Sequence, residues 1–402
     1  MASFKRNRVV NTSLVLREIW THHEISRVQI ARNLDLDKST ITSVVSELLE
    51  RGLVEETAIG ESGPQGGRRP VFLRLNGAKG SVLGIEMKPD GYTAVAVDLT
   101  GKILQSWSGD REIFQANLGD TFHEIVRTVR SASTLTAPIQ GVGLGVSGVV
   151  DSERGVITYS IPLGIAEPWD FNAKVAMRCD LPVCIENDAN ACAWAELAFN
   201  RTRRLRNFLF VLLEFRDTAR LPGLHERTAL GLGVVIEGRV HHGCSYSAGE
   251  FRSVLRGPGN KGQFSLTHAE SLRITEDPGL RGRLIEELAR NVAMLVTTLN
   301  LDEIYLGGDI ETYGPSVIAE FERWIQDSWP YPDAVRCRVG FSSLGRRAVA
   351  YGAAGLVLNR LFAELGSVGR LGSVQESFPA GVAEQFRSAT TEKSEAMFSK
   401  DG

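Results

Sequence analysis

The sequence has no apolar stretch long enough to cross a membrane. Its apolar runs are short, FLFVLL at 208–213 being typical, whereas a spanning helix needs about 20 apolar residues. The basic N-terminal segment MASFKRNRVVNTS is not followed by an apolar core, so a secretory signal is not expected. We therefore expect a soluble, cytoplasmic protein that does not associate with membranes.

Cysteine is scarce, and no strong excess of charge is present. The five cysteines are an odd number without a C-x-x-C pair, which argues against a disulfide framework and against a zinc site built from cysteines. The formal net charge is −3, and residues 1–76 hold 11 Lys or Arg against 9 Asp or Glu. This balance alone does not predict nucleic-acid binding. With 402 residues, 43% hydrophobic and 23% charged, the chain can form two or three globular cores.

The first part of the chain contains three helical patterns. Residues 12–22 place apolar side chains at helical spacing, Ser26 can cap a second helix and Asp37 a third, and Gly52 ends the third. The residues expected to face inward are Leu14, Leu16, Ile19 and Trp20 in the first helix, Val28, Ile30, Ala31 and Leu34 in the second, and Ile41, Val44, Val45, Leu48 and Leu49 in the third.

The third helix has a polar N-terminal end, formed by Lys38, Ser39, Thr40, Thr42 and Ser43. In a helix-turn-helix, the N-terminal residues of the second helix enter the major groove, where short hydroxyls reach base edges or phosphates. We therefore predict that these five residues contact DNA.

A glycine-rich segment follows the third helix. The strand-like segments LVEET and PVFLRL are joined by AIGESGPQGGRR, the pattern of a wing, and Arg68 and Arg69 at its tip suit phosphate or minor-groove contacts. We predict that residues 1–76 form a winged helix-turn-helix DNA-binding domain. The alternative is a three-helix domain for protein contacts, in which the hydroxyls only cap helices and the arginines are solvated surface.

From Ser81 onwards, strand-like and helical segments alternate, which predicts an α/β region with two lobes. After Leu361 the periodicity is lost and Gly, Ser, Thr and charged residues prevail, so we expect residues 363–402 to be a flexible tail. We assign no role to residues 214–230.

Four segments of the α/β region carry a family resemblance. In order, GVGLGVSGVVDSERGVI, LPVCIENDANACAWAE, LGLGVVIEGRVHHGCSYSAGEF and LDEIYLGGDI resemble the ROK family of sugar kinases and repressors over residues 80–362. The N-terminal domain points to the repressor branch. The resemblance implies a two-lobed actin-like ATPase fold that senses a sugar, in a homodimer or higher oligomer bound to a double-stranded DNA operator.

The resemblance also implies a sugar-binding pocket. It places Asp188 at the family's catalytic base, with Asn187 beside it, and it aligns Glu250 and Glu270 with two further sugar-contacting carboxylates. Such a set offers donors and acceptors for vicinal hydroxyls. The alternative is that Asn187 caps the following helix and that both glutamates are surface residues.

Two departures from the family pattern argue against catalysis and against a metal. The phosphate loop Asp-x-Gly-Gly-Thr is replaced by GIEMKPDG, in which Lys88 and Pro89 stand for the glycines. Ser253 stands at the family's zinc-binding histidine, and the segment NKGQFSLTHAES has no cysteine and a single weak ligand candidate, His268. We therefore expect no phosphoryl transfer, no metal and no cofactor.

The leading interpretation is a sugar-responsive transcriptional regulator. Two alternatives remain open. One is an ATP-dependent sugar kinase with a fused DNA-binding domain, which Asp188 favours and the altered phosphate loop opposes. The other is a regulator whose α/β region docks another protein and holds no small molecule.

Overall fold

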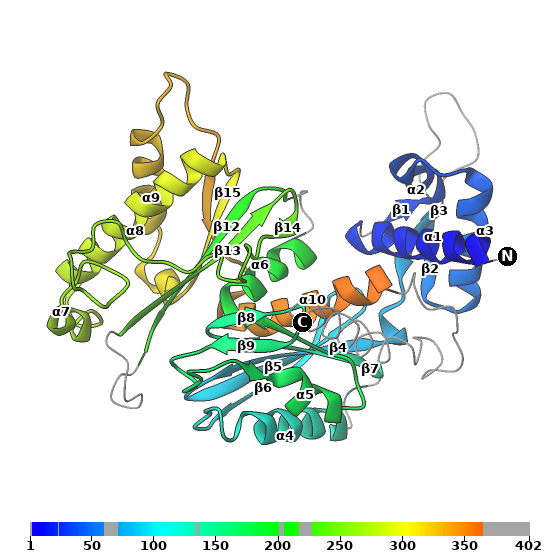
Figure 1. Cartoon of the computed structure of the whole chain (residues 1–402). Helices are drawn as coiled ribbons and strands as arrows, with labels where there is room; N and C mark the ends of the chain where they lie inside the picture. Colours follow the sequence, from blue (N-terminus) through cyan, green and yellow to red (C-terminus); the bar gives the residue numbers. More distant parts are fainter. Residues whose placement is uncertain are drawn as a thin grey trace, which may run out of the picture.

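The computed structural model describes residues 2–22, 24–59, 71–132, 135, 137–200, 205–216 and 227–364. Within them the chain forms an N-terminal headpiece and two α/β lobes (Figure 1), which confirms the predicted fold class. The wing arginines Arg68 and Arg69, residues 217–226 and the predicted tail from residue 365 lie outside the described residues. No helix in the described ranges is long and apolar enough to span a membrane.

The headpiece combines three helices with a small sheet. Its helices are α1 (Ala2–Thr21), α2 (Arg27–Leu34) and α3 (Lys38–Glu50). The strands β1 (Ile25–Ser26), β2 (Val54–Ile59) and β3 (Val71–Leu75) pair in the order β1-β3-β2. Helix α1 begins ten residues earlier than predicted, and β1 is too short to be recognised from its sequence.

Most of the predicted local signals in the headpiece are present. Ser26 and Gln29 form a capping box at the start of α2, and Gly52, with φ of +66°, follows the end of α3. Asp37 precedes α3 but makes no capping hydrogen bond with its side chain, so that prediction was wrong. The predicted inward faces were partly wrong too: Leu14 is 37% exposed and Val28 42% exposed. In α1, Val15 is buried instead of Leu14; in α2, Ile30 and Ala31 are buried as predicted, while Leu34 and Leu49 are half-buried.

The first lobe is built on a five-stranded sheet with the order β11-β7-β4-β5-β6. Helix α4 (Leu118–Ser131) covers the face opposite to the last helix of the chain (Figure 1). The strands are β4 (Ser81–Lys88), β5 (Gly91–Asp98), β6 (Ile103–Asp110), β7 (Ile139–Val146) and β11 (Val183–Asn187). A small sheet of β8 (Val149–Asp151), β9 (Val156–Tyr159) and β10 (Trp169–Asp170) leads into α5 (Phe171–Lys174) and the 3-10 turn η2 (Ala176–Arg178).

The second lobe repeats the topology of the first, with the strand order β14-β13-β12-β15-β16. In both sheets the central strand pairs antiparallel with the next strand of its hairpin and parallel with a later strand, so β4 and β12 are equivalent. The strands are β12 (Phe208–Phe215), β13 (Thr228–Ile236), β14 (Arg239–Val240), β15 (Glu303–Gly308) and β16 (Arg338–Phe341). The helices are α7 (His268–Leu272), α8 (Pro278–Leu299) and α9 (Ser316–Asp327), with the turns η3 (Asp309–Tyr313) and η4 (Gly345–Arg347).

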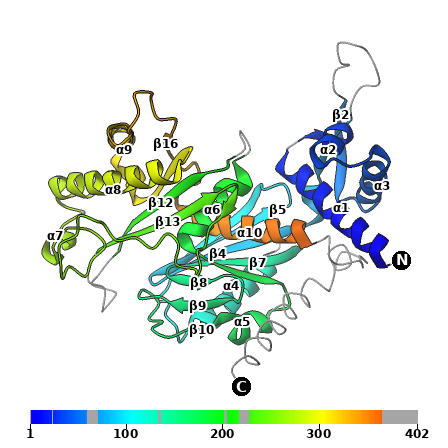
Figure 2. The ribbon, with the colours of Figure 1, turned by 45° about the horizontal axis from the view of Figure 1, so that its top comes forward.

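Two helices lie between the sheets, α6 (Asp188–Phe199) and α10 (Ala348–Glu364) (Figures 1 and 2). Glycines let α10 pack with its backbone against both neighbours. A Cβ on Gly84 of β4 would overlap the carbonyl oxygen of Ala350, and a Cβ on Gly352 would overlap the carbonyl oxygen of Ala191 in α6. Because such contacts leave no free space, α10 is held firmly against the first sheet and α6.

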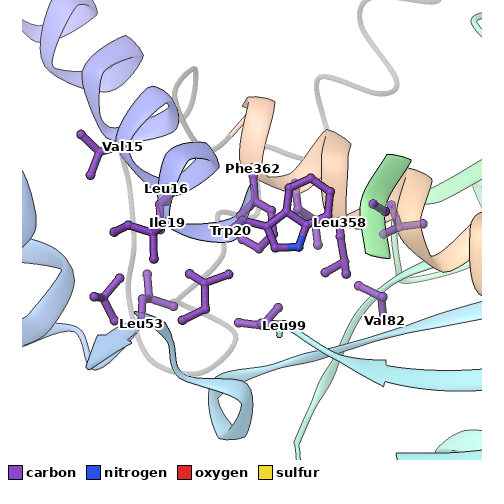
Figure 3. Packing of buried hydrophobic residues seen from close by; sticks show 14 of the residues in the cluster. Val15, Leu16, Ile19, Trp20, Leu53, Val82, Leu99, Leu358 and Phe362 are labelled. Atoms are coloured by element: carbon purple, nitrogen blue, oxygen red, sulfur yellow. The ribbon is translucent and has the colours of Figure 1, made fainter. Parts of the chain in front are cut away.

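The headpiece and the first lobe share one buried apolar cluster (Figure 3). Trp20, at the end of α1, packs against Phe362 near the end of α10, with 5.2 Å between the ring centroids. Leu53 of the headpiece and Val82 and Leu99 of the first lobe belong to the same cluster. The turn η1 (Gly77–Lys79) connects the two parts. The headpiece is therefore packed onto the first lobe as well as joined to it by the chain.

Candidate functional site

The polar end of α3 lies on the surface of the headpiece. Lys38, Ser39, Thr42 and Ser43 are exposed and Thr40 is half-buried. The Thr42 hydroxyl donates to the Lys38 carbonyl at 2.7 Å, so toward DNA it can act only as an acceptor. The structure thus brings the five predicted residues together at one accessible helix end.

Two arginines of the headpiece are balanced by acidic residues of β2. The guanidinium of Arg27 lies 2.9 Å from the Glu56 carboxylate, and that of Arg74 lies 2.5 Å from Glu55. These pairs limit the positive charge around α3.

Asp188 stands at the start of α6, where the carboxyl end of β11 meets the space between the lobes. One carboxylate oxygen accepts a hydrogen bond from Ser147 at 2.6 Å, and the other accepts from the Asn187 amide at 3.0 Å and from the Ala189 N–H at 2.8 Å. Burial raises the pKa of Asp188, and the nearby negative charge of Glu214 raises it further. The carboxylate is fixed in position and remains a strong acceptor.

Asn187 mainly holds its neighbours in place. Its side-chain oxygen caps α6 by accepting from the Asn190 N–H at 3.0 Å, and its amide donates to the Gly148 carbonyl at 2.9 Å and to Asp188. Both amide hydrogens are therefore used. The capping alternative is correct for this residue, which can offer a ligand only a free acceptor site and otherwise orients Asp188.

Glu250 faces Asp188 from the second lobe. Its backbone forms an isolated bridge with Gly231 of β13, a position whose Cβ would lie 3.7 Å from an Asp188 carboxylate oxygen. Partial burial raises the pKa of Glu250, the Asp188 charge raises it further, and Arg216 opposes the shift. Glu250 is exposed, so its carboxylate is accessible to a ligand.

Glu270 is not brought to this group. It is the third residue of the short helix α7, where it forms a capping box with Thr267 and an ion pair with Arg283 at 2.6 Å. The backbone hydrogen bond from Thr267, with the Arg283 contact, lowers the pKa of Glu270 to about 2. The resemblance aligned Glu270 with a sugar-contacting carboxylate, whereas here its carboxylate is engaged by Thr267 and Arg283.

The positions aligned with the family's zinc site are Ser253 and His268. Ser253 is buried and accepts hydrogen bonds from the Asn291 amide and the Leu255 N–H, both at 3.1 Å. His268 is exposed at the start of α7. Across the part of the chain that the structure describes, no group of three or more His, Cys, Asp or Glu is arranged to hold a metal ion.

The sequence did not identify three site residues that lie at the facing strand ends: Lys88, Glu214 and Arg216. Lys88, at the end of β4, places its ammonium 2.5 Å from Glu214 of β12 and 3.1 Å from Glu86. Arg216, directly after β12, donates to the Ser147 hydroxyl at 3.3 Å. The residues come from segments far apart in the chain, so only the equivalence of β4 and β12 could have suggested that they meet.

A cavity of about 670 Å³ lies between the lobes next to these residues. Both lobes and the start of α10 contribute to its walls, with Lys88, Tyr92, Ser147, Glu214, Arg216 and Val349 among them. Its size suits a small polar molecule. The cavity reaches Asp188 through Ser147, which lines it and donates a hydrogen bond to the Asp188 carboxylate.

On the other side of Asp188, a histidine of the second lobe contacts the first. His242 Nε2 lies 2.8 Å from the buried carboxylate of Glu186, whose other oxygen accepts from the Asn187 N–H at 2.9 Å. Burial alone would lower the pKa of His242, but the hydrogen bond to Glu186 and its charge outweigh that effect, so the pKa is raised. This contact also supports the loop that carries Asp188.

Comparison with known proteins agrees with this arrangement. Residues 82–252 match the ROK family, and residues 11–60, in the headpiece, match the MarR family. The α/β region is therefore similar to the ROK family over residues 82–252, and the headpiece is similar to the MarR family. The ROK match begins one residue into β4 and ends just after Glu250, so it includes Lys88, Asp188 and Arg216.

Relatives of known name include regulators. The xylose repressor of Bacillus subtilis is 26% identical over 385 residues, which cover 87% of this chain and 95% of that protein. The xylose repressor of Caldicellulosiruptor bescii is 28% identical over 247 residues, covering 60% of this chain and 57% of that protein. A solved structure described as a ROK family transcriptional regulator, homologous to the Escherichia coli MLC protein, superposes with a TM-score of 0.69 at 20% identity, over 90% of this chain and 98% of that chain. The last likeness concerns the fold alone.

Proposed function

We propose that this protein is a transcriptional regulator that binds a DNA operator through α3 and changes its operator affinity when a sugar or a related small molecule occupies the pocket around Asp188. Two findings support the proposal. The headpiece presents the polar end of α3 on its surface, and a cavity of suitable size is lined by Ser147, which donates a hydrogen bond to Asp188. The names of the xylose repressors favour a repressor and make pentoses the first compounds to test.

The observation that carries the proposal is the path of α10. Val349, in its first turn, lines the cavity, and Phe362, near its other end, packs against Trp20 of the headpiece. Strand β4 also reaches both places, because Val82 belongs to the shared cluster and Lys88 lines the cavity. A ligand that moves the lobes would therefore alter the support of the headpiece. It shifts operator binding only as far as it prefers one of the two states.

Phosphoryl transfer is not part of the proposal. Pro89 has no backbone N–H to offer a phosphate, and Lys88 is engaged by two carboxylates. We further propose that the protein acts as a homodimer or higher oligomer without a cofactor, since two headpieces would match the two half-sites of a palindromic operator.

The test combines a ligand screen with operator binding. Sugars and sugar phosphates are screened for thermal stabilisation of the full chain, because a ligand at 100 times its dissociation constant adds about 2.7 kcal/mol. Operator binding is then measured with and without each stabilising compound for the wild type and for Asp188→Asn. Hydrogen bonds to charged groups contribute about 1.5–3 kcal/mol, so we expect the variant to lose roughly tenfold to a hundredfold in effector affinity while ligand-free operator binding is kept.

Glu270→Gln is the matched variant. It also replaces a carboxylate by an amide, but at a position that the structure keeps apart from Asp188, so we expect a normal effector response. An unchanged response in Asp188→Asn would contradict the pocket assignment. Phosphorylation of a stabilising sugar by the wild type with ATP and magnesium, lost in Asp188→Asn, would make the protein a kinase. A screen without any stabilising compound would favour control by a docked protein.

A further inference from the structure

The contact between Lys88 and Glu214 joins equivalent points of the two lobes. Lys88 is the last residue of β4, and Glu214 is the last but one of β12, the corresponding central strand. The Lys88 ammonium lies 2.5 Å from Glu214 and 3.1 Å from Glu86 on its own strand. The two residues are separated by 126 positions in the sequence, so the pair fixes the relative position of the two sheets at the cavity.

The carboxylates that Lys88 contacts are largely buried, so they depend on its charge. Glu86 is 4% exposed and Glu214 is 16% exposed in their side chains. The second oxygen of Glu86, Oε2, is buried without a hydrogen-bond partner among the described residues. Burial raises the pKa of Glu86 to about 7 in spite of Lys88, whereas the charges of Lys88 and Arg216 overcome burial at Glu214 and lower its pKa. Without Lys88, two neighbouring carboxylates would be left in a poorly solvated place with only Arg216 to balance them.

Lys88 brings a positive charge of the chain itself to this end of the cavity. Where the family's kinases have a phosphate loop, this chain has a lysine, and its single positive charge faces two carboxylates. Lys88 is thereby engaged within the chain itself, while Arg111, Arg216 and Arg346 also line the cavity.

We propose that Lys88 is a built-in latch, which pins the end of β4 to the end of β12 and keeps the two lobes closed without a bound nucleotide. The latch itself does not depend on the proposed function; only its effect on operator binding does. Other polar contacts also cross between the lobes, among them those from Arg216 to Ser147 and from His242 to Glu186 and Ser152. Loss of the latch therefore loosens the cavity end of the lobes but does not separate them.

The test measures hydrogen exchange of the full-length chain in Lys88→Met and in Glu214→Gln. Methionine keeps the length of the side chain without its charge, and glutamine keeps the shape of Glu214 while Lys88 remains balanced by Glu86. We expect exchange at the end of β4, the start of β5 and the end of β12 to rise at least about tenfold in both variants. Arg130→Met is the control, because it removes a cation paired with Asp180 within the first lobe, and it should leave these segments unchanged.

The double variant provides a second readout, by comparison with Lys88→Met. If the two residues act as one latch, Lys88→Met combined with Glu214→Gln loosens the segments no more than Lys88→Met alone, since the second change removes a contact that is already lost. Additive effects, or exchange at the wild-type rate in Lys88→Met, would refute the latch. Faster exchange with unaltered operator binding would keep the latch and count against the coupling in the proposed function.

Discussion

The contact between Phe362 and Trp20 gives the most direct test of how the sensor lobes reach the headpiece. Phe362 is 1% exposed and belongs to α10, so Phe362→Ala removes the contact without changing a headpiece residue. Truncation of a buried phenylalanine costs about 3–5 kcal/mol. If the contact with the headpiece accounts for about 2 kcal/mol of this cost, the equilibrium between attached and detached headpiece shifts roughly thirtyfold toward the detached form.

The assay is hydrogen exchange of α1, α3 and β3 in the full chain, followed by operator binding. We expect exchange in the headpiece to rise at least about tenfold, and the difference in operator affinity with and without a stabilising sugar to fall toward zero. Phe321→Ala is the control, because Phe321 is equally buried but lies in the core of the second lobe. This variant should loosen the second lobe and leave headpiece exchange as in the wild type. If Phe362→Ala instead keeps wild-type exchange in the headpiece and a full sugar response, α10 does not connect the cavity to the headpiece.

Two further predictions concern the operator and pH. Alanine at Arg68 and Arg69 should weaken binding to all DNA sequences and flatten its salt dependence, whereas alanine at Ser39 or Ser43 should change sequence preference. Both effects are measured by titrating several operators at two salt concentrations. If alanine at Ser39 weakened binding to every sequence equally, base contacts by α3 would be contradicted. His242→Gln should lower the melting temperature most below about pH 6.5, the ordinary pKa of histidine, because a raised folded pKa stabilises the fold below the unfolded pKa. The corresponding loss of folding free energy, about 1.5–3 kcal/mol for a hydrogen bond to a charged group, should shrink as pH rises through the folded pKa. A loss independent of pH would show that His242 is not protonated in the folded protein.

The headpiece could be predicted from the sequence because its signals are local. The capping box at Ser26 and Gln29 spans four residues, and Gly52 marks a helix end by its own backbone conformation. The errors are local as well. Val15 is buried and Leu14 exposed, since neighbouring apolar residues on a helix differ by about 100° in direction and the sequence does not state which side meets the core.

The candidate site could be predicted only in part, because its contacts are not local. Asp188 was found through its motif, but the roles of Lys88 and Arg216 depend on the approach of two sheets whose strands are far apart in the chain. Glu270 was selected because the resemblance aligns it with a sugar-contacting carboxylate of the family. Its carboxylate is engaged by Thr267 and Arg283 instead.

The loss of the phosphate loop and the presence of a headpiece have a common physical consequence. In a kinase, closure of the lobes depends on nucleotide as well as sugar, so a headpiece attached to such lobes would respond to both. Here the cation that faces Glu214 belongs to the chain itself, so the two strand ends are joined without a nucleotide. Ser147, which donates a hydrogen bond to Asp188, lines the same cavity, so a ligand there lies close to Asp188. If both proposals hold, the position of α10, and with it the support of Trp20, depends on the sugar alone, which is what a regulator that reports one metabolite requires.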